Sequence, residues 1–207
     1  MLHNRFDFRA YLSTWFVVAV IPLSVLVIMY APDSLGYENG ILENLQMILL
    51  MLCLIFCVTA KADKPLYLFC ATVVLFLMLR EVNCGRVLFW SRPGEVFHCG
   101  PADDYLKWKE IPHGSVIRTS VYVVASLLCL LALFRKGNLT AIVKLAWRTR
   151  IPFWELLLLI CGIATGMIAE RFNICFLAEE MGEMLMYTAL TSAIYRYTRS
   201  LQPQISA

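Results

Sequence analysis

The run TWFVVAVIPLSVLVIMYA, at residues 14–31, contains no charged side chain and is almost entirely apolar. A helix needs about 20 such residues to cross the hydrocarbon core of a bilayer, so this run predicts a transmembrane helix. Arg5 and Arg9 precede it, as basic residues precede the core of a signal peptide. No small-residue cleavage site follows, and the run is long for a signal peptide. We therefore expect the first helix to be retained in the protein.

Five further apolar runs follow, and together they predict the fold class. They lie at residues 42–60, 65–79, 116–134, 152–169 and 181–194. The third and sixth predicted spans are short, so we expect them to extend past their charged flanks or to be shielded by neighbouring helices. Hydrophobic residues make up 60% of the 207 and charged residues 16%, against about half and about a quarter in soluble domains. We predict one all-α domain over residues 1–207, a polytopic membrane protein with a bundle of six transmembrane helices.

Charged residues divide unequally between the two ends of the predicted bundle. With the N-terminus inside, the inner segments hold 11 of the 18 Lys and Arg residues, and the outer segments hold 12 of the 15 Asp and Glu residues. Lys and Arg accumulate on the cytoplasmic side of membrane proteins. Both termini are therefore predicted to be cytoplasmic, in a multi-pass protein of the inner (plasma) membrane.

The basic loop from Arg135 to Arg150 falls on the predicted cytoplasmic side. Anionic lipid of the inner leaflet is the simplest partner for such a segment, and a cytosolic protein docked there is the alternative. The net charge of +3 is small and gives no indication of nucleic-acid binding. Membrane lipid is thus the first predicted partner.

The outer segment 80–115 is longer than most connections, and such loops are generally functional or partly structured. Its glycines and prolines are turn signals, so we expect a folded cap over the bundle. Cys84 and Cys99 lie in it, and the sequence leaves open whether they form a disulfide. A metal site that uses His98 and Asp104 lacks a defined ligand spacing, so no metal is predicted.

Polar and charged residues gather at the predicted outer ends of several spans. They are Glu43, Gln46, Arg80, Glu81, Glu170, Arg171, Glu179, Glu180 and Glu183. Glu81 and Glu170 end their helices, where the helix dipole disfavours a carboxylate, so each needs a tertiary partner or a function. Charged groups at membrane depth usually face a protein interior or a water-filled cavity. We predict an outward-facing polar vestibule with Glu183 as its central residue; the alternative is a set of solvated charges at helix starts.

Two glycines predict how the fifth span packs. Gly162 and Gly166 are four residues apart, a small-residue spacing that allows close helix contact, within the bundle or in a homo-oligomer. Glu170 continues the spacing, so we expect the same face to carry it into the contact. Arg171 is expected to pair with an acid on another helix.

Absent residue types restrict the chemistry. None of the three histidines lies in a predicted span, which excludes bis-histidine haem within the bundle, and no Asp does, which argues against intramembrane aspartyl proteolysis. No cofactor is predicted. The first functional hypothesis is a protein that senses, binds or transports a cation, proton or small polar ligand, as a homo-oligomer or with a protein partner. The alternatives are an enzyme acting on a lipid or lipid-linked substrate at the outer leaflet, with Glu183 or Glu170 as acid/base, and a subunit whose charges are purely structural.

Three short motifs carry a family resemblance. Leu79-Arg80-Glu81 ends one span, Phe89-Trp90 follows in the loop, and Ala178-Glu179-Glu180 with Glu183 opens the last span. This arrangement resembles small multi-spanning bacterial inner-membrane proteins of unknown function. The resemblance implies a location and a general architecture and no activity.

Overall fold

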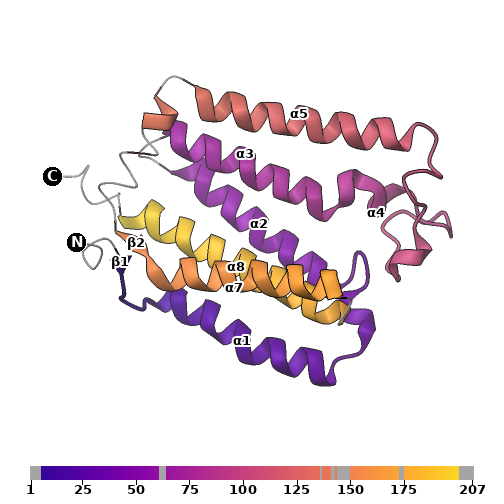
Figure 1. Ribbon diagram of the computed structural model, residues 1–207, viewed down its shortest axis with the longest axis horizontal. Helices are drawn as coiled ribbons and strands as arrows, with labels where there is room; N and C mark the ends of the chain where they lie inside the picture. The colour runs from indigo at the N-terminus through magenta and orange to yellow at the C-terminus, as the bar shows by residue number, and fades with distance from the viewer. Residues whose placement is uncertain are drawn as a thin grey trace.

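Six long helices run along a common axis, each antiparallel to the one before it (Figure 1). The computed structural model describes residues 6–60, 64–135, 137–140, 143, 150–172 and 175–200. Within these ranges the long helices are α1 (Leu12–Tyr30), α2 (Ile41–Thr59), α3 (Lys64–Glu81), α5 (Gly114–Phe134), α7 (Phe153–Phe172) and α8 (Phe176–Ser200). The predicted all-α class is confirmed for the described chain, apart from two strands of two residues each.

Those strands mark one end of the bundle, which we call the strand end. They are β1 (Phe6–Asp7) and β2 (Ile151–Pro152), which pair in parallel. The connection from α1 to α2 contains η2 (Asp33–Gly36) and lies at the opposite end, as does the segment between α3 and α5. We call that opposite end the cap end.

The two short predicted spans are longer in the structure than their apolar runs. Helix α3 has 18 residues and begins at Lys64, and α8 has 25 and includes all the acids from Glu179 to Glu183. Helices α1, α2, α5 and α7 are long and apolar enough to cross a membrane, and α3 with the short helices after it is a fifth candidate, bent by 53°. The chain is therefore all-helical, with four to five helices of membrane-crossing character.

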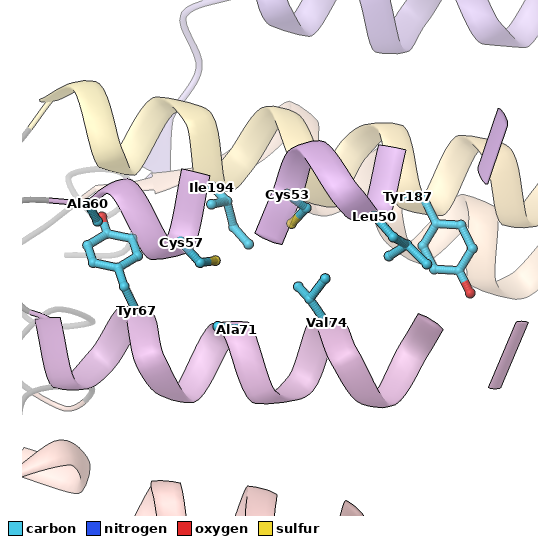
Figure 2. Packing of buried hydrophobic residues seen from close by; sticks show 9 residues of the cluster. All are labelled: Leu50, Cys53, Cys57, Ala60, Tyr67, Ala71, Val74, Tyr187 and Ile194. Carbon is cyan, nitrogen blue, oxygen red and sulfur yellow. The ribbon is translucent and has the colours of Figure 1, made fainter. Parts of the chain in front are cut away.

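Helix α8 lies at the centre although it is not among these apolar helices. It packs against α1, α2 and α7, while α3 packs against α2 and α5. Its neighbours thus shield its polar residues from the surroundings. The largest buried cluster joins α2, α3 and α8, as Figure 2 shows. Its members are Leu50, Cys53, Cys57, Ala60, Tyr67, Ala71, Val74, Tyr187 and Ile194.

The outer helices present apolar side chains to the surroundings. Trp15 and Phe16 of α1 and Leu128, Leu131 and Phe134 of α5 are all more than half exposed. A soluble monomer rarely exposes apolar patches larger than a few hundred Å². This surface is compatible with a membrane as the surrounding medium.

Helices α7 and α8 touch through their backbones. A Cβ atom on Gly162 would lie 2.6 Å from the backbone nitrogen of Met186 and 2.8 Å from the carbonyl oxygen of Gly182. A Cβ on Gly182 would lie 2.6 Å from the backbone nitrogen of Gly166. The predicted small-residue face of α7 therefore lies against α8. At Gly162 and Gly182 the two backbones are so close that only glycine fits.

The segment after α3 is folded and attached to the loop before α2. It contains η3 (Asn83–Gly85), α4 (Arg86–Phe89) and η4 (Ala102–Asp104). The Asn39 amide donates hydrogen bonds to the carbonyl oxygens of Val87 at 2.7 Å and His98 at 2.8 Å. We call residues 82–113 the cap. Cys84 and Cys99 are free thiols here.

Charged pairs reinforce the cap. Arg86 lies 3.5 Å from Glu38, and although this guanidinium lowers the pKa of Glu38, burial has the larger effect and raises it above its ordinary value. His98 lies 3.0 Å from Asp104, whose hydrogen bond raises the pKa of His98 above its usual range. Within the described residues no three His, Cys, Asp or Glu side chains form a group that could hold a metal ion.

Candidate functional site

Charged side chains from two helices meet at the cap end of the bundle. Arg80, at the end of α3, lies 2.5 Å from the carboxylate of Glu183 on α8 and 3.2 Å from that of its neighbour Glu81. The buried Tyr187 phenol, one turn further along α8, donates a hydrogen bond to Glu81 and accepts one from Arg80 at 3.1 Å. Arg80 thus ties the last turn of α3 to the first turns of α8.

A buried amide extends this contact to α2. Gln46 is 0% exposed, and its Nε2 donates to the carbonyl oxygen and to the carboxylate of Glu180, both at 2.9 Å. Within the described residues no donor reaches the Gln46 Oε1. A buried acceptor without a donor costs about 1–3 kcal/mol. We call Gln46, Arg80, Glu81, Glu180, Glu183 and Tyr187 the cap-end cluster.

Glu43 connects the cap-end cluster to the cap. It lies on the first turn of α2 and accepts a hydrogen bond from the backbone amide of Asn39, whose side chain holds the cap. Glu43 is also close enough to Glu183 to interact with it electrostatically. Glu179 is half-buried and interacts in the same way with Glu183. Both predicted vestibule residues therefore lie beside the cluster.

Carboxyl groups outnumber guanidinium groups at this site. Arg80 pairs with the carboxylates of Glu81 and Glu183, and Glu43 and Glu180 lie close enough to Glu183 to interact with it electrostatically. Only 5% of the Glu81 side chain and 14% of that of Glu183 are exposed. An isolated charge is costly to bury unless a partner neutralises it or the group takes up a proton.

The predicted pairing of the fifth span was wrong. Glu170 and Arg171 are both exposed and form no ion pair or hydrogen bond with any described residue. Gly162, Gly166 and Ala169 are the buried positions of this face of α7. Ala169 follows Gly162 by seven residues, which is almost two full turns of the helix, so both lie on the same face. Glu170 follows Gly162 by eight residues and is therefore rotated about 80° past two full turns. Glu170 therefore points away from the contact that Gly162 begins.

A second buried polar site lies at the strand end. Glu155 of α7 has a side chain that is 0% exposed, and it accepts hydrogen bonds from Thr14 of α1 at 2.6 Å and from Ser192 of α8 at 3.3 Å. Its other carboxylate oxygen lies 2.7 Å from Arg196, whose guanidinium also reaches Asp7 at 2.9 Å. We call these five residues the strand-end cluster.

Sequence reasoning missed the strand-end cluster, although a signal existed. Glu155 lies inside the predicted span 152–169, and a carboxylate within an apolar span usually faces the protein interior and has a partner. Its partners are separated from it by up to 141 residues of sequence, from Thr14 to Glu155. Only the packing of α1, α7 and α8 reveals which groups meet. Tyr187, which follows Glu179 and Glu183 at four-residue spacing, was the corresponding signal at the cap end.

The basic loop from Arg135 to Arg150 lies mostly outside the described residues, so the docking of a cytosolic partner there stays a prediction. Comparison of the chain with protein-family models, curated proteins and solved structures found no match. The resemblance to small bacterial inner-membrane proteins likewise stays a prediction.

Proposed function

We propose that this chain is a six-span membrane protein whose cap-end cluster binds a proton or a small cation from the outer side. The supporting observation is the surplus of carboxyl groups over guanidinium groups within the cluster. Arg80 neutralises at most one of the two carboxylates that it contacts, those of Glu81 and Glu183, and Glu180 is a third carboxyl group of the cluster. A bound cation or bound protons would neutralise the others, and the Gln46 Oε1, which has no donor among the described residues, supplies a further acceptor.

The same proposal assigns the topology. The six long helices alternate in direction between the strand end and the cap end (Figure 1). The acids at the cap end and the predicted excess of bases at the other end favour cytoplasmic termini. The location we propose is the inner (plasma) membrane, with the cap outside. Sensing and transport both begin with this binding step, in a homo-oligomer or a larger complex.

The enzyme hypothesis has less support from the geometry. Glu183, its first acid/base candidate, is held in an ion pair by Arg80 at 2.5 Å. Glu170, the second, is exposed and lies outside the cap-end cluster. A general acid or base must reach the reacting group of the substrate while still able to exchange its proton. We therefore place cation binding first.

A thermal-shift experiment tests the binding site. The purified protein in lipid nanodiscs is heated at constant ionic strength with increasing ammonium or methylammonium. A ligand that binds only the folded protein adds about 2.7 kcal/mol of stability at a hundredfold excess over its Kd. We expect at least one of these cations to raise the Tm of the parent, and to raise it less at lower pH because protons compete.

Two glutamine variants supply the matched comparison. Glu180→Gln removes one carboxylate from the cluster and keeps an acceptor for Gln46, so it should abolish most of the cation-dependent shift. Glu170→Gln removes an exposed carboxylate of the neighbouring helix and should leave the shift unchanged. Equal shifts in the parent and both variants, or no shift with any cation at any pH, would refute cation binding at this cluster.

A further inference from the structure

A shallow groove of about 360 Å³ lies on α5. It is lined by Arg118, Thr119, Tyr122, Val123, Ser126 and Leu127. Tyr122 forms its inner wall and leans on Phe76 of α3, with the ring centroids 5.9 Å apart. Val123 and Leu127 are half exposed. The groove is thus open to the medium that surrounds the bundle.

Tyr122 interacts with the Cys84 thiol and with Arg118, whereas the other polar side chains of this groove have no hydrogen-bond partner among the described residues. Within the described chain, Arg118, Thr119 and Ser126 are exposed and make no side-chain hydrogen bond and no ion pair. All three lie on α5, one of the helices that are long and apolar enough to cross a membrane. An unpaired charge on such a helix is expensive and normally has a partner. Arg118 has no carboxylate partner among the described residues, so an anion from outside this part of the chain can pair with it.

Depth along α5 distinguishes the kinds of partner. Arg118 lies on the second turn of the helix, near the cap end, and Ser126 lies about 12 Å further along the axis at 1.5 Å per residue. The lining changes along this path from a guanidinium, through the Thr119 hydroxyl and the Tyr122 ring, to Val123 and Leu127. A phospholipid changes in the same order, from phosphate, through glycerol esters, to acyl chain.

We propose that the groove binds one anionic phospholipid, with the lipid phosphate on Arg118 and the first acyl carbons against Val123 and Leu127. The guanidinium matches a phosphate in charge and in bidentate geometry. The hydroxyl of Thr119, next to Arg118, provides a donor for an ester oxygen. This site does not depend on the proposed cation binding, because it shares no residue with the cap-end cluster.

Native mass spectrometry of the full chain in detergent tests this proposal. The protein is titrated with phosphatidylglycerol and, in parallel, with phosphatidylcholine, and the first bound lipid is counted. We expect the parent to bind phosphatidylglycerol more tightly than phosphatidylcholine. Arg118→Gln should weaken this binding about tenfold or more, the cost of one charged hydrogen bond, and Arg118→Lys should weaken it less.

Two further variants separate the groove from general charge effects. Arg171→Gln removes another exposed arginine near the cap end that has no described partner, and it should leave phosphatidylglycerol binding unchanged. Ser126→Phe fills the lower groove, leaves Arg118 in place and should also weaken binding. Equal loss in Arg118→Gln and Arg171→Gln, or no loss in either, would overturn the proposal. A changed oligomeric state in Arg118→Gln with undiminished lipid binding would overturn it in favour of a partner helix.

Discussion

Arg196→Ala lowers the free energy of unfolding by about 3–5 kcal/mol, the typical cost of removing one partner of a buried ion pair. The variant leaves the Glu155 carboxylate, whose side chain is 0% exposed, without its cation. It also releases Asp7, and with it the attachment of the N-terminal strand to α8. The measurement is a denaturant titration of the protein in detergent micelles, followed by loss of helicity.

A second substitution identifies the stranded charge as the cause. Glu155→Gln removes the charge but keeps an oxygen that accepts from Thr14 and Ser192, so the double variant with Arg196→Ala should recover part of the loss. Arg171→Ala, which removes an exposed arginine without a described partner, should change stability by less than about 0.5 kcal/mol. If Arg196→Ala and Arg171→Ala unfold alike, the strand-end cluster is not a buried ion-pair network.

The ion pair at the cap end should contribute less. Arg80 has a side chain that is 44% exposed, so solvent screens its attraction to Glu183 and Glu81. We expect Arg80→Ala to destabilise by roughly 1–2 kcal/mol, between the values for exposed and buried pairs. The same titration checks this order, with Arg196→Ala the larger effect. A reversed order would show that the cap-end cluster holds the bundle more firmly than the strand-end cluster.

Hydropathy alone located the six long helices but not the length of two of them. The runs 65–79 and 181–194 stop at charged residues, yet α3 and α8 continue through them. A hydropathy window treats each helix as if lipid surrounded it, whereas α8 is surrounded by α1, α2 and α7. Other helices take the place of lipid around α8, so its polar residues are tolerated. The apolar run is therefore shorter than the helix.

The positions of the charged residues in the sequence predicted part of the candidate site, the meeting of Arg80 and Glu183. Arg80 and Glu183 were both expected at the same end of the bundle, and they meet there. Arg171 was likewise expected to pair with an acid on another helix, but Arg171 is exposed. The ends of α3 and α7 contain the same residue types, but different residues from other helices face them. A single sequence does not show which residues from other helices face a given helix end.

The two clusters give α8 a structural role that neither shows alone. Its first turns hold Glu180 and Glu183, and its last turns hold Ser192 and Arg196. Each cluster joins α8 to different neighbours, α2 and α3 at one end and α1 and α7 at the other. A movement of α8 in response to a ligand at the cap end would therefore strain the hydrogen bonds and ion pairs of the strand-end cluster.

Gly182→Ala is expected to cost about 3 kcal/mol, at the upper end of the range for overpacking. The added methyl group would lie 2.6 Å from the backbone nitrogen of Gly166 and 3.0 Å from the carbonyl oxygen of Gly162. Backbone atoms cannot rotate away as a flexible side chain can, so α7 and α8 must separate. The contact that places the glutamates of α8 would then be lost over most of its length.

Gly166→Ala is the matched control, on the same face of the facing helix. Its added methyl group would lie 3.8 Å from the carbonyl oxygen of Glu179 and 3.8 Å from the Cγ of Glu183, which is ordinary van der Waals contact. In addition, alanine favours the helix over glycine by about 1 kcal/mol, so this variant should be as stable as the parent or slightly more so. Gly162→Ala should resemble Gly182→Ala, because its methyl group also meets backbone atoms. If all three variants unfold at the same denaturant concentration, α7 and α8 are not in backbone contact, and the face that positions the cap-end cluster has been misassigned.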